Sequence, residues 1–231
     1  MTPKVLVVLT SYNKLPNGNP SGWYLPEFAH PHEVLHNKVS LTIASPNGGE
    51  APLDPASVKA FESDAVSQTF LKEQKTLWTN THKLSDMVSR VNEFDAIFYV
   101  GGHGPMFDLT NDQSSLALIQ AFAAAGKIVS AVCHGPCVLL HATAPSGEKL
   151  IHGVSVTGFS NAEEDQTGLS KEMPFMLETE LGRVTGGKYV KAKEPWGRWL
   201  LLVRRLGRGR RLLPGRIRLR RRGLGRRFLR L

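Results

Sequence analysis

The sequence predicts an α/β protein built on a mostly parallel sheet with helices on both faces. Three observations lead there: apolar runs of strand length without alternation, helical segments of about ten residues between them, and glycine-rich loops directly after some runs. Strands buried on both faces of a parallel sheet appear as continuous apolar runs. Alternating strands and helices are typical of a doubly wound sheet. A length of 231 residues predicts one core.

The first half of the chain gives two strands and one helix. A strand is predicted at 4–10, a loop rich in Asn, Gly and Pro follows, and a helix is predicted at 23–37. The next strand, at 39–45, stops at Pro-Asn-Gly-Gly, which is a turn signal. Residues 51–92 are polar and mixed, so only scattered helical turns are expected there.

The second half repeats the order of strand, loop and helix. The predicted elements are strands at 95–100, 127–132 and 154–157, and helices at 114–125, 137–142 and 173–181. Pro174 falls in the first turn of the last helix, where proline is tolerated. The whole pattern predicts a flavodoxin-like, three-layer sandwich with a nucleophile elbow.

Charge divides the chain at Gly197. Residues 198–231 contain 14 Arg, 10 Leu and 5 Gly, with no Lys, Asp or Glu, whereas residues 1–197 carry 15 Lys and Arg against 20 Asp and Glu. The domain at 1–197 is therefore mildly acidic, and the overall charge of +9 comes from the tail. We expect 198–231 to be an out-of-frame or mis-spliced, disordered end. The alternative is an arm that binds nucleic acid or an anionic membrane.

Composition excludes several classes of protein. No apolar run approaches the ~18 residues of a membrane span, and the stretch at 5–9 is too short for a secretory signal. We therefore expect a cytoplasmic protein, with the nucleus as a second location. The two cysteines, Cys133 and Cys137, are too few for a disulfide scaffold, so chemistry is the better use for a thiol here.

Two His-Gly-Pro segments, beginning at His103 and His134, each follow a predicted strand. Ligands of open α/β sheets bind beyond the carboxyl ends of the strands, so both loops are expected at the site. Cys133 lies where strand meets helix, as a nucleophile in an elbow does, and a helix N-terminus lowers a thiol pKa. The alternative to a nucleophile is that Cys133 is a small buried residue that only packs in the core. The backbone N–H of His134, with that of Gly102 or His103, is expected to hold an oxyanion.

A cysteine–histidine pair needs a carboxylate to orient the imidazole. Glu163, Glu164 and Asp165 follow the strand at 154–157, and spacing alone neither chooses among them nor excludes a solvated acidic loop. Glu27 lies among aromatic and aliphatic residues at the start of the first helix. Its carboxyl either stays partly protonated beside the thiol or is an ordinary first-turn glutamate.

Three further interpretations have less support. Cys137 lies one helical turn after Cys133 and is expected to serve packing. Cys-His-Gly-Pro-Cys has one residue too many for a redox Cys-x-x-Cys motif. A metal site could use His30, His32 and His36 as ligands. Spacing fixes no further ligand, so no metal is predicted.

Five segments carry a resemblance to a known family: Leu9-Thr10-Ser11-Tyr12, Gly22 to Pro31, Gly102-His103-Gly104, Ala131 to Pro136, and Thr157 to Glu164. Together they resemble the ThiJ/PfpI superfamily, within the class I glutamine amidotransferase-like fold. The likeness covers 3–197 and is strongest to the fungal heat-shock branch of glutathione-independent glyoxalases, also called D-lactate dehydratases.

The resemblance implies a role for each candidate residue. The cysteine of Ala-Val-Cys-His-Gly-Pro is the nucleophile of the family, which corresponds to Cys133, and the next residue, His134, is its histidine. The acid that closes the Thr-Gly-Phe segment corresponds to Glu164, and the glutamate beside the thiol corresponds to Glu27.

The implied activity converts methylglyoxal, or a similar 2-oxoaldehyde, to D-lactate in carbonyl-stress defence. It proceeds through a cysteine hemithioacetal without glutathione, metal, nucleotide or other cofactor. A deglycase or peptidase acting through the same Cys-His-Glu site is the enzymatic alternative, and a holding chaperone with unfolded clients is the non-enzymatic one. A homodimer is a further expected partner state, and nucleic acid is a partner only if the tail is genuine.

The resemblance ends at Gly197. The strand, the Thr-Gly-x-Asn-Pro-x-Ser segment and the final helix of the family have no counterpart in 198–231. We therefore expect part of the core to be exposed.

Overall fold

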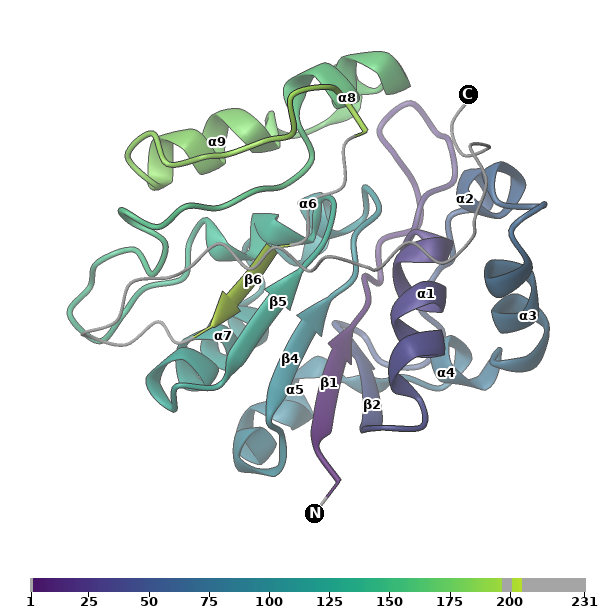
Figure 1. Cartoon of the computed structure of the whole chain (residues 1–231), viewed down its shortest axis with the longest axis horizontal. Coiled ribbons are helices and arrows are strands. Elements are labelled where there is room, and N and C mark those ends of the chain that lie inside the picture. The colour runs from purple at the N-terminus through teal and green to yellow at the C-terminus, as the bar shows by residue number, and fades with distance from the viewer. Residues whose placement is uncertain (1, 197–200, 205–231) are drawn as a thin grey trace.

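Six strands form one sheet in the order β3-β2-β1-β4-β5-β6 (Figure 1). The structure is a computed structural model and describes residues 2–196 and 201–204. Strands β1 to β5 are parallel, and β6 is antiparallel to β5. The strands are β1 (Lys4–Val8), β2 (Ser40–Ser45), β3 (His82–Lys83), β4 (Ala96–Tyr99), β5 (Ile128–Ala131) and β6 (Leu201–Arg204).

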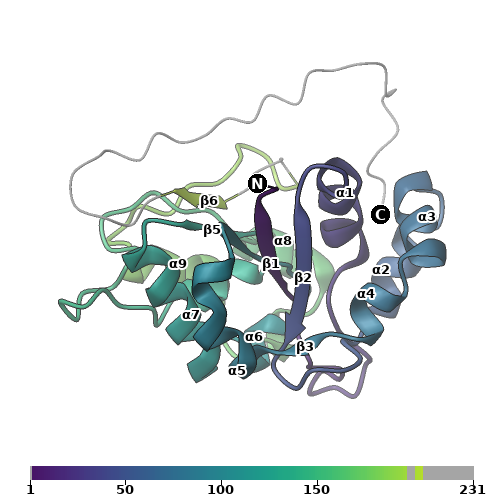
Figure 2. The same cartoon turned by 90° about the horizontal axis from the view of Figure 1, so that it is seen from below.

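Helices pack on both faces of this sheet, as Figure 2 shows in the view from below. Aspartate side chains cap α2, α3 and α7, and a serine caps α8, so most of the longer helices begin at a residue that satisfies free backbone N–H groups. The α-helices are α1 (Leu25–Leu35), α2 (Pro55–Ala60), α3 (Ala65–Glu73), α4 (Thr76–Thr79), α5 (Leu84–Met87), α6 (Pro105–Asp108), α7 (Gln113–Ala124), α8 (Asn161–Thr167) and α9 (Leu177–Val184). Three 3₁₀ helices are η1 (Val88–Glu93), η2 (Gly135–Leu139) and η3 (Ser170–Glu172).

The alternation of side chains along the central strand divides the core in two. Leu6 and Val8 of β1 face a large cluster formed with α5, α7, η2 and α9, whereas Val7 and Leu9 face a smaller one with α1, α3 and α4. All four side chains are almost fully buried. Burial on both faces explains the unbroken apolar run of this strand and confirms the predicted three-layer α/β fold.

Several predicted elements differ from the observed ones. The expected strand at 154–157 is wrong: its one backbone pairing is an isolated bridge between Val156 and Tyr189. Three β-branched residues and a serine do not suffice for a strand without a neighbouring strand to complete the ladder. The helix expected at 137–142 is the 3₁₀ helix Gly135–Leu139, and the one expected at 173–181 begins only at Leu177.

Two regions hold more structure than the sequence indicated. Residues 51–92 form α2 to α5, η1 and the short strand β3. Helix α8 was not predicted, although Ser160 and Glu163 form a capping box at its start: Ser160 Oγ accepts from the Glu163 backbone, and the Glu163 carboxylate accepts from the Ser160 N–H. Short capped helices were missed because their apolar faces are only one turn long. No helix in the described part of the chain has the length and apolarity to cross a membrane.

The Arg/Leu-rich tail contributes one strand. We expected 198–231 to provide none, yet residues 201–204 pair with β5, with Leu202 opposite Ser130 and Leu201 opposite Ala131. The remainder of this segment, 198–200 and 205–231, lies outside the described residues.

One face of β4 and β5 has no described helix over it (Figure 1). Phe98 and Ile128 point to this face and are half-buried, whereas the residues that alternate with them, Ile97, Tyr99 and Val129, are buried on the other face. Phe98 packs against the smaller core cluster, and the exposure expected from the family's absent final helix stays a prediction.

We expect deletion of residues 198–231 to expose the outer edge of β5. Because the backbone amides of this strand then lose partners from β6, hydrogen exchange in the peptide that contains 128–131 should accelerate on the order of tenfold, as the loss of about one hydrogen bond's stabilisation implies. Exchange in the peptide containing β1, in the middle of the sheet, is the internal control. Equal exchange of 128–131 in both proteins would show that β6 is not formed in solution.

Candidate active site

The candidate residues gather beyond the carboxyl ends of β4 and β5. The loop after β4 carries Gly102 and His103, and the turn after β5 carries Cys133 and His134. Helix α8, which lies across this end of the sheet in Figure 1, supplies Glu164. This is the edge at which open α/β sheets bind ligands.

Cys133 lies in a strained turn between β5 and η2. Its φ of +57° places a non-glycine residue in the left-handed region, which is rare for side chains other than those of Asn, Asp and Gly. Two backbone hydrogen bonds hold the turn: the Phe159 N–H donates to the carbonyl of Cys133 at 2.8 Å, and the Gly135 N–H donates to that of Val132 at 2.8 Å. The turn presents the thiol of Cys133 at the end of the sheet, as a nucleophile elbow does.

A line of hydrogen bonds runs from Glu164 to this thiol. His134 Nε2 lies 2.6 Å from Glu164 Oε2, and His134 Nδ1 lies 3.2 Å from Cys133 Sγ. Burial, together with the neighbouring His103, lowers the pKa of His134 to about 4, so the imidazole is neutral at pH 7. Because a carboxylate only accepts, Nε2 carries the proton, and Nδ1 is left to accept from the thiol.

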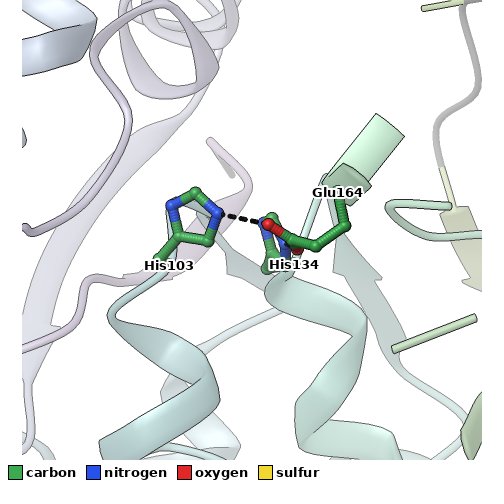
Figure 3. Close-up of side chains that lie close together, drawn as sticks. All are labelled: His103, His134 and Glu164. Carbon is green, nitrogen blue, oxygen red and sulfur yellow. Dashed lines mark hydrogen bonds and ion pairs between the residues drawn. The ribbon is translucent and has the colours of Figure 1, made fainter. Parts of the chain in front are cut away.

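Glu164 is held in its ionised form. Burial by itself raises the pKa of a carboxyl, but the hydrogen bonds from His103 and His134 outweigh it and keep the pKa of Glu164 well below its usual range. His103 Nε2 lies 3.0 Å from Oε1, on the other oxygen of the same carboxylate (Figure 3). One carboxylate thus orients two imidazoles.

The structure distinguishes the three consecutive acids that spacing left open. Glu163 is engaged in the capping box of α8 and also accepts the Trp196 N–H at 2.7 Å. Asp165 is exposed and accepts from the hydroxyl of Ser170 at 2.6 Å. Of the three, only Glu164 is buried and reaches His134.

Glu27, at the start of α1, lies beside the thiol. Its Oε2 accepts the Gly101 N–H at 2.9 Å. Burial raises the pKa of Glu27 to about 7, against smaller opposing contributions from the hydrogen bonds with Cys133 and Gly101. A Cβ at Gly101 would lie 2.6 Å from this carboxylate oxygen and 2.8 Å from the Cys133 Cβ, so only glycine permits the approach.

We expected a helix N-terminus to lower the pKa of the Cys133 thiol, but other effects on this pKa are larger. Burial, and then the charge of Glu27, raise the pKa of Cys133 well above its ordinary value. The helix that follows is a five-residue 3₁₀ helix, whose dipole is small. Hydrogen bonds from the backbone N–H groups of Gly102 and His134 act in the opposite direction and lower the thiol pKa.

These same N–H groups are the candidate oxyanion holders. The Gly102 N–H points to the thiol, and its φ of +93° and the absence of space for a Cβ explain why glycine stands there. His103 was expected to contribute its backbone. The contact that the structure gives it at the site is through its imidazole, on Glu164.

Aromatic residues that the sequence analysis did not select surround the pair. The ring of Phe159 lies 4.2 Å from that of His134, and Trp196 meets Phe159 edge-on at 5.6 Å. The charge of Cys133, after burial, contributes to raising the pKa of Tyr24 to about 12, which places this side chain near the thiol. The Thr-Gly-Phe segment was the signal for Phe159, but Trp196 had none because it lies 37 residues later.

The remaining candidates lie apart from this centre. Cys137 is fully buried in the larger core, and its S–H donates to the carbonyl of Pro105. His30 binds Asp64 at 2.8 Å, and His32 stacks on His36. Among the described residues these histidines do not converge on a common point with a third ligand, whereas His103, His134 and Glu164 do.

Comparison with known proteins identifies relatives over most of the chain. Residues 26–174 match the model of the DJ-1/PfpI family. Glyoxalase 3 of Candida albicans is 31% identical over 84% of this chain and 85% of its own length. Glutathione-independent glyoxalase HSP31 of Saccharomyces cerevisiae is 27% identical over 90% of this chain and 92% of its own.

Solved structures agree with these matches. The crystal structure of glyoxalase III from Candida albicans superimposes with a TM-score of 0.77 at 30% identity, covering 86% of each chain. The Rapid Encystment Protein of Francisella tularensis gives a TM-score of 0.79 at 34% identity, covering 85% of this chain and 87% of that one. The matched region includes both histidines, the cysteine and the two glutamates of the site. The chain belongs to the DJ-1/PfpI family.

Proposed function

We propose that this protein is a glutathione-independent glyoxalase that converts methylglyoxal, or a similar 2-oxoaldehyde, to D-lactate. The observation that carries the proposal is the line of contacts from Glu164 through His134 to Cys133. The relatives that bear glyoxalase names, at 31% and 27% identity, support it.

The first step joins the thiol to the aldehyde. Cys133 Sγ attacks the aldehyde carbon while its proton passes to Nδ1 of His134, and the N–H groups of Gly102 and His134 hold the oxyanion. Burial raises the thiol pKa and lowers the imidazole pKa, so a free thiolate–imidazolium pair is disfavoured. The proton therefore moves as the carbon–sulfur bond forms, and the anionic Glu164 stabilises the transient imidazolium.

The second step moves hydrogen between two carbons. His134 returns its proton to the oxyanion, giving a hemithioacetal, and then removes the hydrogen of the sulfur-bearing carbon. This gives an enediol. Protonation of its neighbouring carbon then leaves a thioester on Cys133. Water cleaves this thioester, which releases lactate and restores the S–H group. One carbon is oxidised while its neighbour is reduced, so the balance needs water but no glutathione, metal or nucleotide. The reverse reaction is a dehydration, which makes the enzyme a lyase.

Glu27 affects the pKa of the Cys133 thiol in this mechanism. With a pKa of about 7, its carboxyl is partly protonated at neutral pH. The ionised form accepts from the S–H group, and the protonated form can donate to the sulfur when the thiol loses its proton. Once ionised, it opposes the negative charge that develops on Cys133. The two groups therefore share protons as a coupled pair.

A deglycase activity is the second candidate. The deglycase HchA of Escherichia coli is 31% identical over 78% of this chain and 65% of its own length. The same thiol and imidazole suit attack on a glycated adduct, so assays on both substrates separate the two activities. The holding-chaperone alternative stays a prediction.

Replacing the nucleophile should abolish turnover. We expect Cys133→Ser to lower the rate of lactate formation from methylglyoxal without glutathione by about 10³-fold or more, because a hydroxyl is a far weaker nucleophile than a thiol. The measurement is enzymatic assay of D- and L-lactate with the full chain. Cys137→Ser is the matched control, since its hydroxyl can also donate to the Pro105 carbonyl, and it should keep most of the activity. Normal turnover by Cys133→Ser would exclude the mechanism.

Removing the charge that orients His134 should slow the reaction while leaving the fold intact. We expect Glu164→Gln to lower kcat by roughly 10²- to 10⁴-fold, because a neutral amide neither fixes the tautomer nor stabilises the imidazolium. Glu163→Gln is the control: glutamine still completes a capping box, so kcat should change little. Equal losses in the two variants would contradict the assignment of the acid to Glu164.

The raised pKa of Glu27 should appear as a dependence of stability on pH. The folded pKa of about 7 exceeds the ordinary 4.5, so its contribution is fully present below pH 4.5 and is lost as the pH rises towards 7. In Glu27→Gln this loss is absent. The free energy of unfolding, measured in urea at pH 4.5 and pH 8, should therefore fall less in the variant, by up to about 3 kcal/mol. Parallel pH profiles would place the carboxyl's pKa near its ordinary value.

A further inference from the structure

Three side chains at the site form a compact group of metal-ligating atoms. Figure 3 shows His103, His134 and Glu164 meeting from three separate segments of the chain. Their ligating atoms all lie within 4.8 Å of one another. The relative exposure of the side chains is 13% for His103, 1% for His134 and 5% for Glu164, so the group is shielded from water but reached from the His103 side. Within the described residues, no other set of three or more His, Cys, Asp or Glu side chains converges in this way.

The proposed reaction accounts for only part of this group. Glu164 needs one imidazole, that of His134, to serve the thiol. The second imidazole, of His103, occupies the other carboxylate oxygen at 3.0 Å, and its ring lies 4.5 Å from that of His134. His103 lies in a tightly packed loop. A Cβ at the next residue, Gly104, would lie 2.5 Å from the Thr10 side chain, so only glycine fits there.

The donor atoms suit a divalent transition metal. Two imidazole nitrogens and one carboxylate form a common ligand set for zinc and related ions, with bonds of about 2.0 to 2.2 Å. Both Nε2 atoms point at the same carboxylate, and each now carries the proton that it donates to that carboxylate. An ion bound between the two nitrogens and the carboxylate would replace those protons on Nε2. Each imidazole keeps one proton, which moves to Nδ1.

We propose that His103, His134 and Glu164 bind Zn²⁺, and that the bound ion inhibits the reaction of Cys133. The inhibition rests on the proposed glyoxalase function, whereas the binding does not. An ion on Nε2 of His134 puts the remaining proton on Nδ1, the atom that faces Cys133 Sγ at 3.2 Å. His134 then cannot accept the proton of the thiol, and Glu164 is no longer available to stabilise an imidazolium.

Binding is tested by isothermal titration calorimetry of the full chain with zinc chloride. We expect one ion per chain in the wild type and in Cys133→Ala, because the thiol is not a ligand. In His103→Asn and His103→Gln we expect affinity to fall by at least about tenfold, as for the loss of a metal-holding side chain. Two substitutions are used so that a folding defect in one, monitored by circular dichroism, does not decide the result. His82→Asn, at an exposed histidine of β3, is the matched control and should bind as the wild type does.

Cobalt chloride identifies the ligands by absorption. Nitrogen and oxygen ligands give weak visible bands, whereas a thiolate ligand adds an intense charge-transfer band in the near ultraviolet. We expect the visible bands alone. The intense band, together with loss of binding in Cys133→Ala, would place the ion on the thiol and overturn the proposal, as would unchanged affinity in both His103 variants or no binding by the wild type.

Inhibition is tested in the lactate assay with and without zinc chloride, and with a chelator added afterwards. We expect zinc to suppress turnover at the concentrations at which it binds, and the chelator to restore it. A His103 variant should need at least about tenfold more zinc for the same fractional loss of its own activity. Zinc that binds one per chain without reducing turnover would overturn the inhibition. If the wild type makes no lactate at all, the proposed function fails alone, because calorimetry and cobalt spectra still decide the site.

Discussion

The carboxylate of Glu164 is the interaction on which the rest of the site depends. It joins α8 to the turn after β5 through His134 and to the loop after β4 through His103. Three segments that are far apart in the sequence meet on one charged group. Because that group is buried and ionised, it needs donors: both imidazoles reach it, and the Thr167 hydroxyl donates to Oε1 at 3.1 Å. The orientation of both imidazoles therefore depends on one carboxylate.

Two glutamates near one thiol are held in opposite states by their surroundings. Glu27 has a single backbone donor and no imidazole partner, so the effect of burial prevails and its pKa rises. Glu164 is also buried, but two imidazoles reverse the effect of burial on its pKa. A carboxyl that can donate thus stands on one side of the sulfur, and a permanent anion stands behind the base. Environments that separate the pKa values of like groups are a recurrent way to assign acid and base roles.

The sheet and the nucleophile turn were predictable because both follow from local pattern. The unbroken apolar run of β1 and the strand-loop succession around Cys133 are visible in a short window of sequence. The failures have a common physical cause: Val154 to Thr157 has strand-like residues but no neighbouring strand, and β6 gains its conformation from pairing with β5. The choice of Glu164 over Glu163 depended on family resemblance, since the capping box that engages Glu163 was not recognised. The imidazole of His103 was missed because its contact crosses 61 positions of sequence.

The proposed nucleophile and its proposed base are consecutive residues, whereas Glu164 is brought by a separate helix. Covalent bonds fix the approach of Cys133 to His134, but the position of Glu164 depends on how a seven-residue helix docks. A local opening of the segment around α8 would leave the sheet folded and the thiol in place while the imidazole turns freely. Catalytic competence in such an architecture is a property of one small cooperative unit. Heat or denaturant would then extinguish turnover before spectroscopic probes of the sheet register any melting.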